Sequence, residues 1–120
     1  MKYLFNIILK IVDFFYQKKI INFFKQNTNS EYKVFIDVGA HKGETIFTFL
    51  KNFKIVNIYS FEASKKTYEK LKTNVKKIRN IYKDTNIEIF NTGIGNSNEK
   101  KIFNELPDSN SSTFNFIDQN

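Results

Sequence analysis

An apolar run that ends in a glycine-containing turn constrains the fold of this chain more than any other feature. Residues 33–38 (Lys-Val-Phe-Ile-Asp-Val) are followed by Gly39 and, four residues later, by Gly43. A run without polar alternation is typical of a parallel strand buried on both faces, and the glycines allow a tight turn and a close backbone approach to a ligand. A second apolar run, residues 55–61, ends at Glu62. Together they predict a β-α-β unit with Glu62 at the tip of its second strand.

The residues around the glycines indicate the kind of ligand. A dinucleotide fingerprint reads Gly-x-Gly-x-x-Gly, whereas this chain has only Gly39 and Gly43, with Asp37 before them. That carboxylate would repel a pyrophosphate but suits the ammonium and sulfonium of S-adenosylmethionine (SAM), so a nicotinamide dehydrogenase is disfavoured. We expect Asp37 to hold the SAM amino group, directly or through water; the alternative is an Asp that only caps the turn. We expect Glu62 to bind the ribose diol; the alternative is an ordinary surface carboxylate.

Three motifs together resemble the front half of FkbM-family SAM-dependent methyltransferases. They are Asp37-Val38-Gly39-Ala40-His41-Lys42-Gly43, then Ser60-Phe61-Glu62, then Asn91-Thr92-Gly93-Ile94-Gly95 with a serine-containing stretch at Ser109 to Thr113. The resemblance covers about Lys33 to about Thr113, and members often have Asn at the place of His41 and Pro at the place of Ala63. It implies a cofactor site made by Asp37, Gly39, Ala40, His41, Gly43, Glu62 and Ala63.

The resemblance also implies the fold and the reaction. The fold would be an α/β, class I methyltransferase (Rossmann-like) fold with an incomplete parallel sheet of strand order 3-2-1, in which strand 1 is an unpaired edge. The reaction would be O-methylation of a hydroxyl on a sugar, glycan or other small metabolite. In this fold the acceptor-binding and base residues usually follow the third strand, so the catalytic residues stay unknown and we expect the isolated 120-residue chain to be inactive. A rival hypothesis is a non-catalytic remnant, or a membrane-associated or interaction module, built on the β-α-β unit.

Periodicity predicts the other elements of a partial SAM-binding domain at residues 33–120, after a linker at 27–32. A helix after Gly43 is expected to bury Ile46, Phe47, Phe49, Leu50 and Phe53. A second helix, capped by Ser64, should bury Tyr68, Leu71, Val75 and Ile78 and expose six lysines. We expect a third strand at residues 87–91, a short strand near 101–104 and a loose polar tail from Pro107.

The N-terminal segment, residues 1–26, is expected to form an amphipathic helix from about Tyr3 to Phe24. Lys10, Asp13, Lys18 and Lys19 interrupt its apolar residues, so no charge-free run reaches the roughly 20 residues of a spanning helix. A signal peptide is not expected, because no small-residue cleavage site follows the short apolar run. Two interpretations remain: the helix packs against the sheet or a missing part of the chain, or it lies in a membrane interface.

The charge and the residue composition limit the kinds of partner that this chain is expected to bind. The net charge is +7, but every basic residue except Arg79 is a lysine and the lysines are dispersed, so we expect no nucleic-acid partner and favour a solvated surface over an anionic membrane surface. The absence of cysteine fits a reducing cytosol, with peripheral contact at the inner face of a membrane left open. His41 is the only histidine; loop structure or cofactor contact is favoured over catalysis, and we expect no metal site. The sequence leaves Ser111, Ser112 and Thr113 open as ligand contacts or flexible tail.

Overall fold

The structure is a computed structural model that describes the backbone of residues 2–100, 103–104 and 113–114, and the side chains of residues 11–100. Its elements follow the order α1 (Lys2–Asn27), β1 (Glu31–Val38), α2 (Glu44–Leu50), β2 (Lys54–Phe61), α3 (Lys65–Ile81), β3 (Asn86–Phe90), β4 (Phe103–Asn104) and β5 (Thr113–Phe114). β4 and β5 form a separate antiparallel pair.

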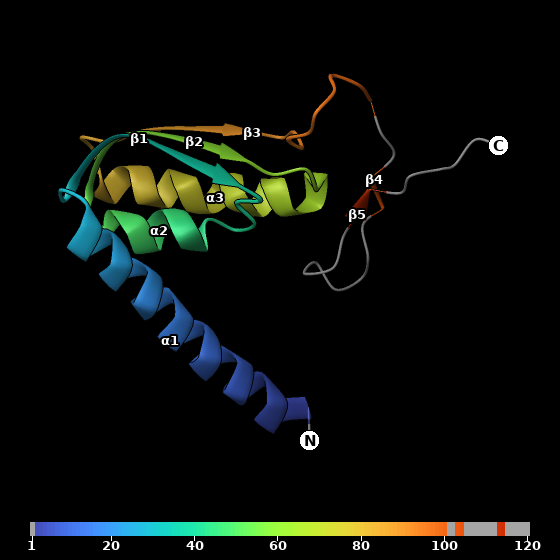
Figure 1. The fold of residues 1–120 in the computed structure, drawn as a ribbon. Coiled ribbons are helices and arrows are strands. Elements are labelled where there is room, and N and C mark those ends of the chain that lie inside the picture. Colours follow the sequence, from blue (N-terminus) through green and yellow to red (C-terminus); the bar gives the residue numbers. More distant parts are fainter. Residues whose placement is uncertain (1, 101–102, 105–112, 115–120) are drawn as a thin grey trace.

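The main sheet has three parallel strands in the order β1-β2-β3, which places β1 at an edge. The predicted α/β class and strand order are confirmed, and the arrangement is compatible with a Rossmann-like fold. Phe35, Ile58 and Ile87 stand side by side across the three strands. The two crossover helices, α2 and α3, lie on the same face of the sheet (Figure 1). All three carboxyl ends of the strands therefore meet at one edge, next to the turns that enter α2 and α3.

The core lies between the sheet and these two helices. Ile46 of α2, Ile58 of β2 and Leu71 and Val75 of α3 are completely buried, and burial of each such side chain stabilises the fold by about 1.5–3 kcal/mol. The predicted cap of α3 is confirmed, because the Ser64 hydroxyl accepts a hydrogen bond from the Thr67 N–H at 3.1 Å. Of the four apolar positions predicted to be buried on α3, three are buried and Tyr68 is partly buried.

The expectation that β1 is buried on both faces is wrong. Val34, Ile36 and Val38 are 51%, 62% and 59% exposed, whereas Phe35 and Asp37, on the alternate face, are covered. The reason is that α2 and α3 occupy one face only, and no described helix covers the other (Figure 1). β1 thus combines an apolar open face with a backbone edge that no described strand pairs, a combination that favours association with another strand.

Two further expectations need correction at the helices. Phe47 was expected in the core but is exposed, with the Lys51 Nζ atom 4.4 Å from its ring centre, because a seven-residue helix presents only one face to the sheet. The linker is shorter than the predicted residues 27–32, because α1 continues to Asn27 and β1 starts at Glu31. Glu31 belongs to the strand because it is the register partner of Lys54 on β2, and the two side chains form an ion pair of 3.0 Å.

Helix α1 packs on the domain only through its C-terminal turns. Ile21 is buried, and the Phe24 ring meets the Phe49 ring edge-on with 5.5 Å between centres. The rest of α1 projects away from the sheet (Figure 1). Phe14, Phe15 and Tyr16 are consecutive and all exposed, so the apolar surface of α1 covers a wide arc of the helix and not a narrow face. In the described part of the chain, no helix is long and apolar enough to cross a membrane.

The predicted loose tail lies outside the described residues, apart from β5.

The open edge predicts concentration-dependent association through β1. Ile36→Lys places a charge on the exposed face of the edge strand and should reduce self-association in sedimentation velocity, while changing the free energy of unfolding by less than about 0.5 kcal/mol. Thr73→Lys, at an exposed position of α3, adds the same charge elsewhere and is the matched control. Equal effects of both variants would show that net charge, and not the edge, governs association.

Candidate functional site

The turn from β1 into α2 is built from left-handed residues. Gly39, His41 and Gly43 have φ angles of +76°, +50° and +91°. A Cβ atom on Gly43 would also approach the Leu71 Cδ1 atom to 3.2 Å, so this position needs glycine both for its conformation and for close packing on α3. Nothing lies within 4 Å of the corresponding Cβ position on Gly39. Gly39 therefore leaves open space beside the backbone at the carboxyl end of β1.

Backbone hydrogen bonds fix this turn onto the end of β2. The N–H groups of Gly39 and Ala40 both donate to the Phe61 carbonyl, at 2.9 and 3.0 Å. The Ala40 carbonyl accepts from the Gly43 N–H at 2.8 Å, and the Ala40 methyl group is buried in the core. Ala40, one of the predicted cofactor residues, thus has its side chain in the core and both backbone groups engaged.

Glu62 joins the two turns that border the carboxyl edge of the sheet. Its Oε2 atom accepts from the His41 N–H at 2.8 Å, and its Oε1 atom accepts from the Ser64 N–H at 2.9 Å. The residue is only 9% exposed, so it is not an ordinary surface carboxylate. A carboxylate has about four acceptor positions, and these two bonds leave others for hydroxyl donors.

Asp37 is buried on the helix-covered face, one residue before β1 ends. It is 7% exposed, and its Oδ2 atom makes no hydrogen bond with any described residue. The same is true of the Oγ atom of Ser60, its register partner on β2. Burial, together with the negative charges of Glu44 and Glu62, raises the pKa of Asp37 to about 6. A buried carboxylate in this state favours the approach of a cation.

His41 and Glu44 close the outer side of the turn. The His41 Nδ1 atom lies 3.2 Å from the Glu44 Oε1 atom, and the Glu44 Oε2 atom accepts from the Lys42 N–H at 3.0 Å. The imidazole is partly exposed and is held against a carboxylate of its own turn. This geometry favours the loop interpretation of His41 over a catalytic one.

Several residues of the site were missed by sequence reasoning. Asn74 of α3 donates to the Lys42 carbonyl at 2.9 Å, and Asn91 donates to the carbonyls of Glu62 and Ala63 at 2.8 and 3.2 Å. Glu44 and Ser60 also belong here. Ser60 and Asn91 stand in the motifs that carry the resemblance, but neither was predicted as a site residue. Glu44 lies at the start of α2 and Asn74 within α3, and solvent exposure is the ordinary expectation for such polar residues.

Other candidate regions do not add to this site. Ser111 and Ser112 lie outside the described residues, and for Thr113 only the backbone is described. A surface depression of about 550 Å³, lined in part by Ser30 and Thr85, lies at the amino ends of the strands, whereas open α/β sheets bind ligands at the carboxyl ends. Within residues 11–100 no group of three or more His, Asp or Glu side chains is placed to hold a metal ion.

Comparisons with family models, with curated proteins and with solved structures found no match for this chain.

The Asp37 environment predicts a pH dependence of stability. Because its pKa is about 6 in the folded protein and 3.8 ordinarily, the folded state binds more protons between these values, and the Asp37 contribution to the free energy of unfolding falls as pH rises from about 4 to about 6. Asp37→Asn should therefore stabilise the protein at pH 7.5 by about 3 kcal/mol, and the gain should shrink toward pH 4.

Urea unfolding of both proteins across this pH range measures the difference. Asp84→Asn, a change at an exposed carboxylate in the loop after α3, is the control and should leave the curve near that of the wild type. An Asp37→Asn protein that is less stable than the wild type at pH 7.5 would contradict the assignment.

Proposed function

We propose that this chain is the SAM-binding part of an FkbM-type methyltransferase that acts on a hydroxyl of a sugar, glycan or other small metabolite. The observation that carries the proposal is Asp37, a buried carboxylate whose Oδ2 atom has no hydrogen-bond partner among the described residues, at the carboxyl end of a parallel strand. A buried carboxylate oxygen without a hydrogen bond lowers the stability of the folded state. Because α/β sheets bind ligands at this edge, a ligand that bonds to Asp37 would explain why the residue is present.

The charges around the turn support a cationic ligand. Asp37, Glu44 and Glu62 act on one another electrostatically, since the last two raise the pKa of the first. The pyrophosphate of a dinucleotide would enter this field at a cost, whereas an ammonium and a sulfonium would be attracted. The electrostatics therefore favour SAM over a nicotinamide cofactor.

The residues present fit the parts of SAM. Asp37 would hold the ammonium group, directly or through water, and the open space beside Gly39 would admit the methionine part close to the backbone. Glu62 would accept from the ribose hydroxyls with the acceptor positions that its two backbone bonds leave. His41 and Ala63, in the adjoining turns, would border the adenosine.

When bound, SAM would supply a methyl group already activated by its sulfonium, so the protein has mainly to bind and align the reactants. In this proposal the residues described here bind and orient the cofactor. None is assigned as the base that takes the hydroxyl proton, since His41 is held against Glu44.

A second candidate function is a non-catalytic interaction module. The open apolar face of β1 favours it, because a surface that joins exposed Val34, Ile36 and Val38 to an unpaired edge is suited to a protein contact. The ligand experiment below separates the two candidates.

Ligand-observed NMR, which detects weak binding, should show binding of SAM to the 120-residue chain and no comparable binding of NADH. Asp37→Asn should weaken the binding of SAM but leave the binding of adenosine unchanged, because adenosine lacks the ammonium group. Glu62→Ala should weaken both by about 1.5–3 kcal/mol, the scale of a charge-assisted hydrogen bond, because both carry the ribose.

The control is Asp84→Asn, which should leave both ligands unaffected, and circular dichroism verifies that each variant is folded. Equal binding of SAM and NADH, or no SAM binding by the folded wild type, would contradict the proposal and favour the interaction module.

A further inference from the structure

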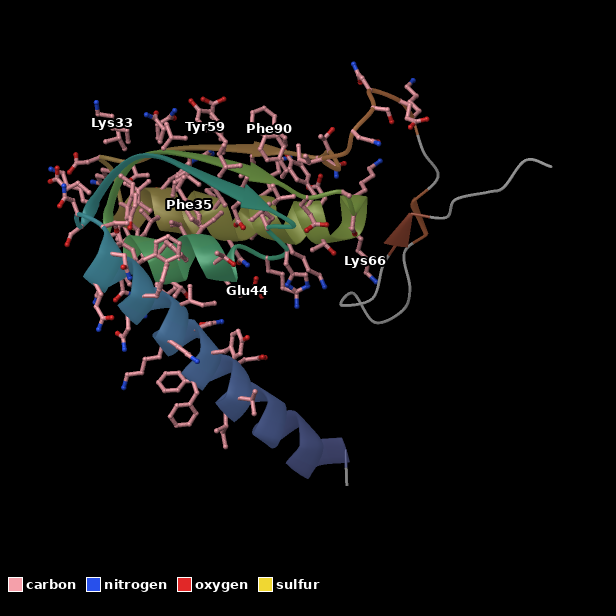
Figure 2. All side chains as sticks on the ribbon, in the orientation of Figure 1. Lys33, Phe35, Glu44, Tyr59, Lys66 and Phe90 are labelled. Atoms are coloured by element: carbon pink, nitrogen blue, oxygen red, sulfur yellow. The ribbon has the colours of Figure 1, made fainter. Side chains whose placement is uncertain are left out.

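The projecting part of α1 exposes an unusual amount of aromatic surface. Every described side chain from residue 11 to residue 20 is exposed. Phe14, Phe15 and Tyr16 are 63%, 62% and 67% exposed, and Ile11 and Val12 are half exposed. Figure 2 shows the side chains drawn on this part of α1 extending from a helix that projects away from the domain. A contiguous apolar surface of this kind on a helix marks a contact with another apolar phase.

The exposed apolar surface of α1 reaches the side of the helix that faces away from the domain. In its C-terminal turns Ile21 and Phe24 face the domain, while Asn22 lies on the opposite side and Lys18 and Lys25 lie on the flank between them. At 3.6 residues per turn, Phe15 lies on the same side as Asn22, away from the domain. Phe14 lies on the same side as Ile21, seven residues later, but Phe15 and Tyr16 cannot be covered by extending the packing of Ile21 and Phe24.

The polar residues in the N-terminal half of the α1 sequence recur at three- and four-residue spacing, as Lys2, Asn6, Lys10, Asp13 and Gln17. On a helix, this sequence spacing corresponds to a narrow polar stripe. Asp13 and Gln17 fall on the side of the helix that carries Phe24 farther along. A broad apolar arc with a narrow polar stripe does not fit a coiled-coil seam, which needs a narrow apolar stripe. It suits immersion in a planar apolar layer.

We propose that α1 anchors the protein to a membrane surface rich in anionic lipid, with Phe14, Phe15 and Tyr16 inserted at the boundary between headgroups and acyl chains. The charges fit this partner, because residues 1–27 carry five lysines against one aspartate. Lys18 and Lys19 follow the aromatic residues directly and are exposed, so they would lie at the level of the lipid phosphates. The helix lies on the membrane in this arrangement. The inference is independent of the cofactor.

Co-sedimentation of the full chain with vesicles tests the apolar contact. The chain should sediment with vesicles of phosphatidylcholine containing about one-third phosphatidylserine and much less with phosphatidylcholine alone. Phe14→Ser with Phe15→Ser should lower the partition coefficient more than about tenfold. The matched control is Ile81→Ser with Ile94→Ser, which removes two exposed apolar side chains outside α1 and should leave partitioning unchanged. All four side chains are exposed, so circular dichroism should be unaltered.

A second pair of variants tests the charge. Lys18→Gln with Lys19→Gln should lower binding at low salt about thirtyfold and reduce its salt dependence, since each lysine near an anionic surface contributes roughly fivefold. Lys76→Gln with Lys77→Gln, on the exposed side of α3, is the control and should have a smaller effect. Equal sedimentation with neutral and anionic vesicles, or equal losses in both lysine pairs, would overturn the proposal. A lipid-free dimer that the phenylalanine variant abolishes would assign this surface to a second copy and would also overturn it.

Discussion

The carboxyl end of the sheet depends on the Glu62 carboxylate, which accepts one hydrogen bond from the turn after β1 and another from the turn after β2. These turns are separated in the sequence by α2 and β2, yet one buried side chain holds both. The bonds are charge-assisted and sheltered from water, and such bonds are about twice as strong as neutral ones. They hold the left-handed turn at residues 39–43 next to Asp37. The proposed cofactor site is thus largely formed before any ligand binds.

The same arrangement places an unfavourable charge in the fold. Asp37 is buried near Glu44 and Glu62, and burial and like charge both raise its pKa. The core of Ile46, Ile58, Leu71 and Val75 supplies the stability that offsets this cost. Stability and the proposed binding therefore depend on different parts of the molecule. The core between the helices and the sheet stabilises the fold, and the edge where the strands end carries the charges that would attract a cation.

The sequence predicted the elements that depend on neighbouring residues alone. Two strands were predicted from the apolar runs at residues 33–38 and 55–61. Helix α3 was predicted from the Ser64 cap and from the spacing of Leu71, Val75 and Ile78. The predictions that were wrong concern burial, which depends on how the elements pack against one another. A run such as Val34-Phe35-Ile36 has the same composition whether helices cover one face of the sheet or two, and the sequence does not show that Phe47 lies on the outer side of a short helix. The backbone bonds of Glu62 were equally invisible, because a strand-end acid is expected to be solvated.

The central claim is that the turn at residues 39–43 and Glu62 together form a site for a cationic adenosyl ligand. Chemical-shift perturbation of the ¹⁵N-labelled chain during titration with SAM tests it most directly, since each backbone amide reports on its own surroundings. The account predicts saturable shifts at Gly39, His41 and Ser64, and none at Glu31 or Thr85 at the opposite end of the sheet. Shifts confined to that opposite end, or no saturable shift anywhere in a folded chain, would contradict it.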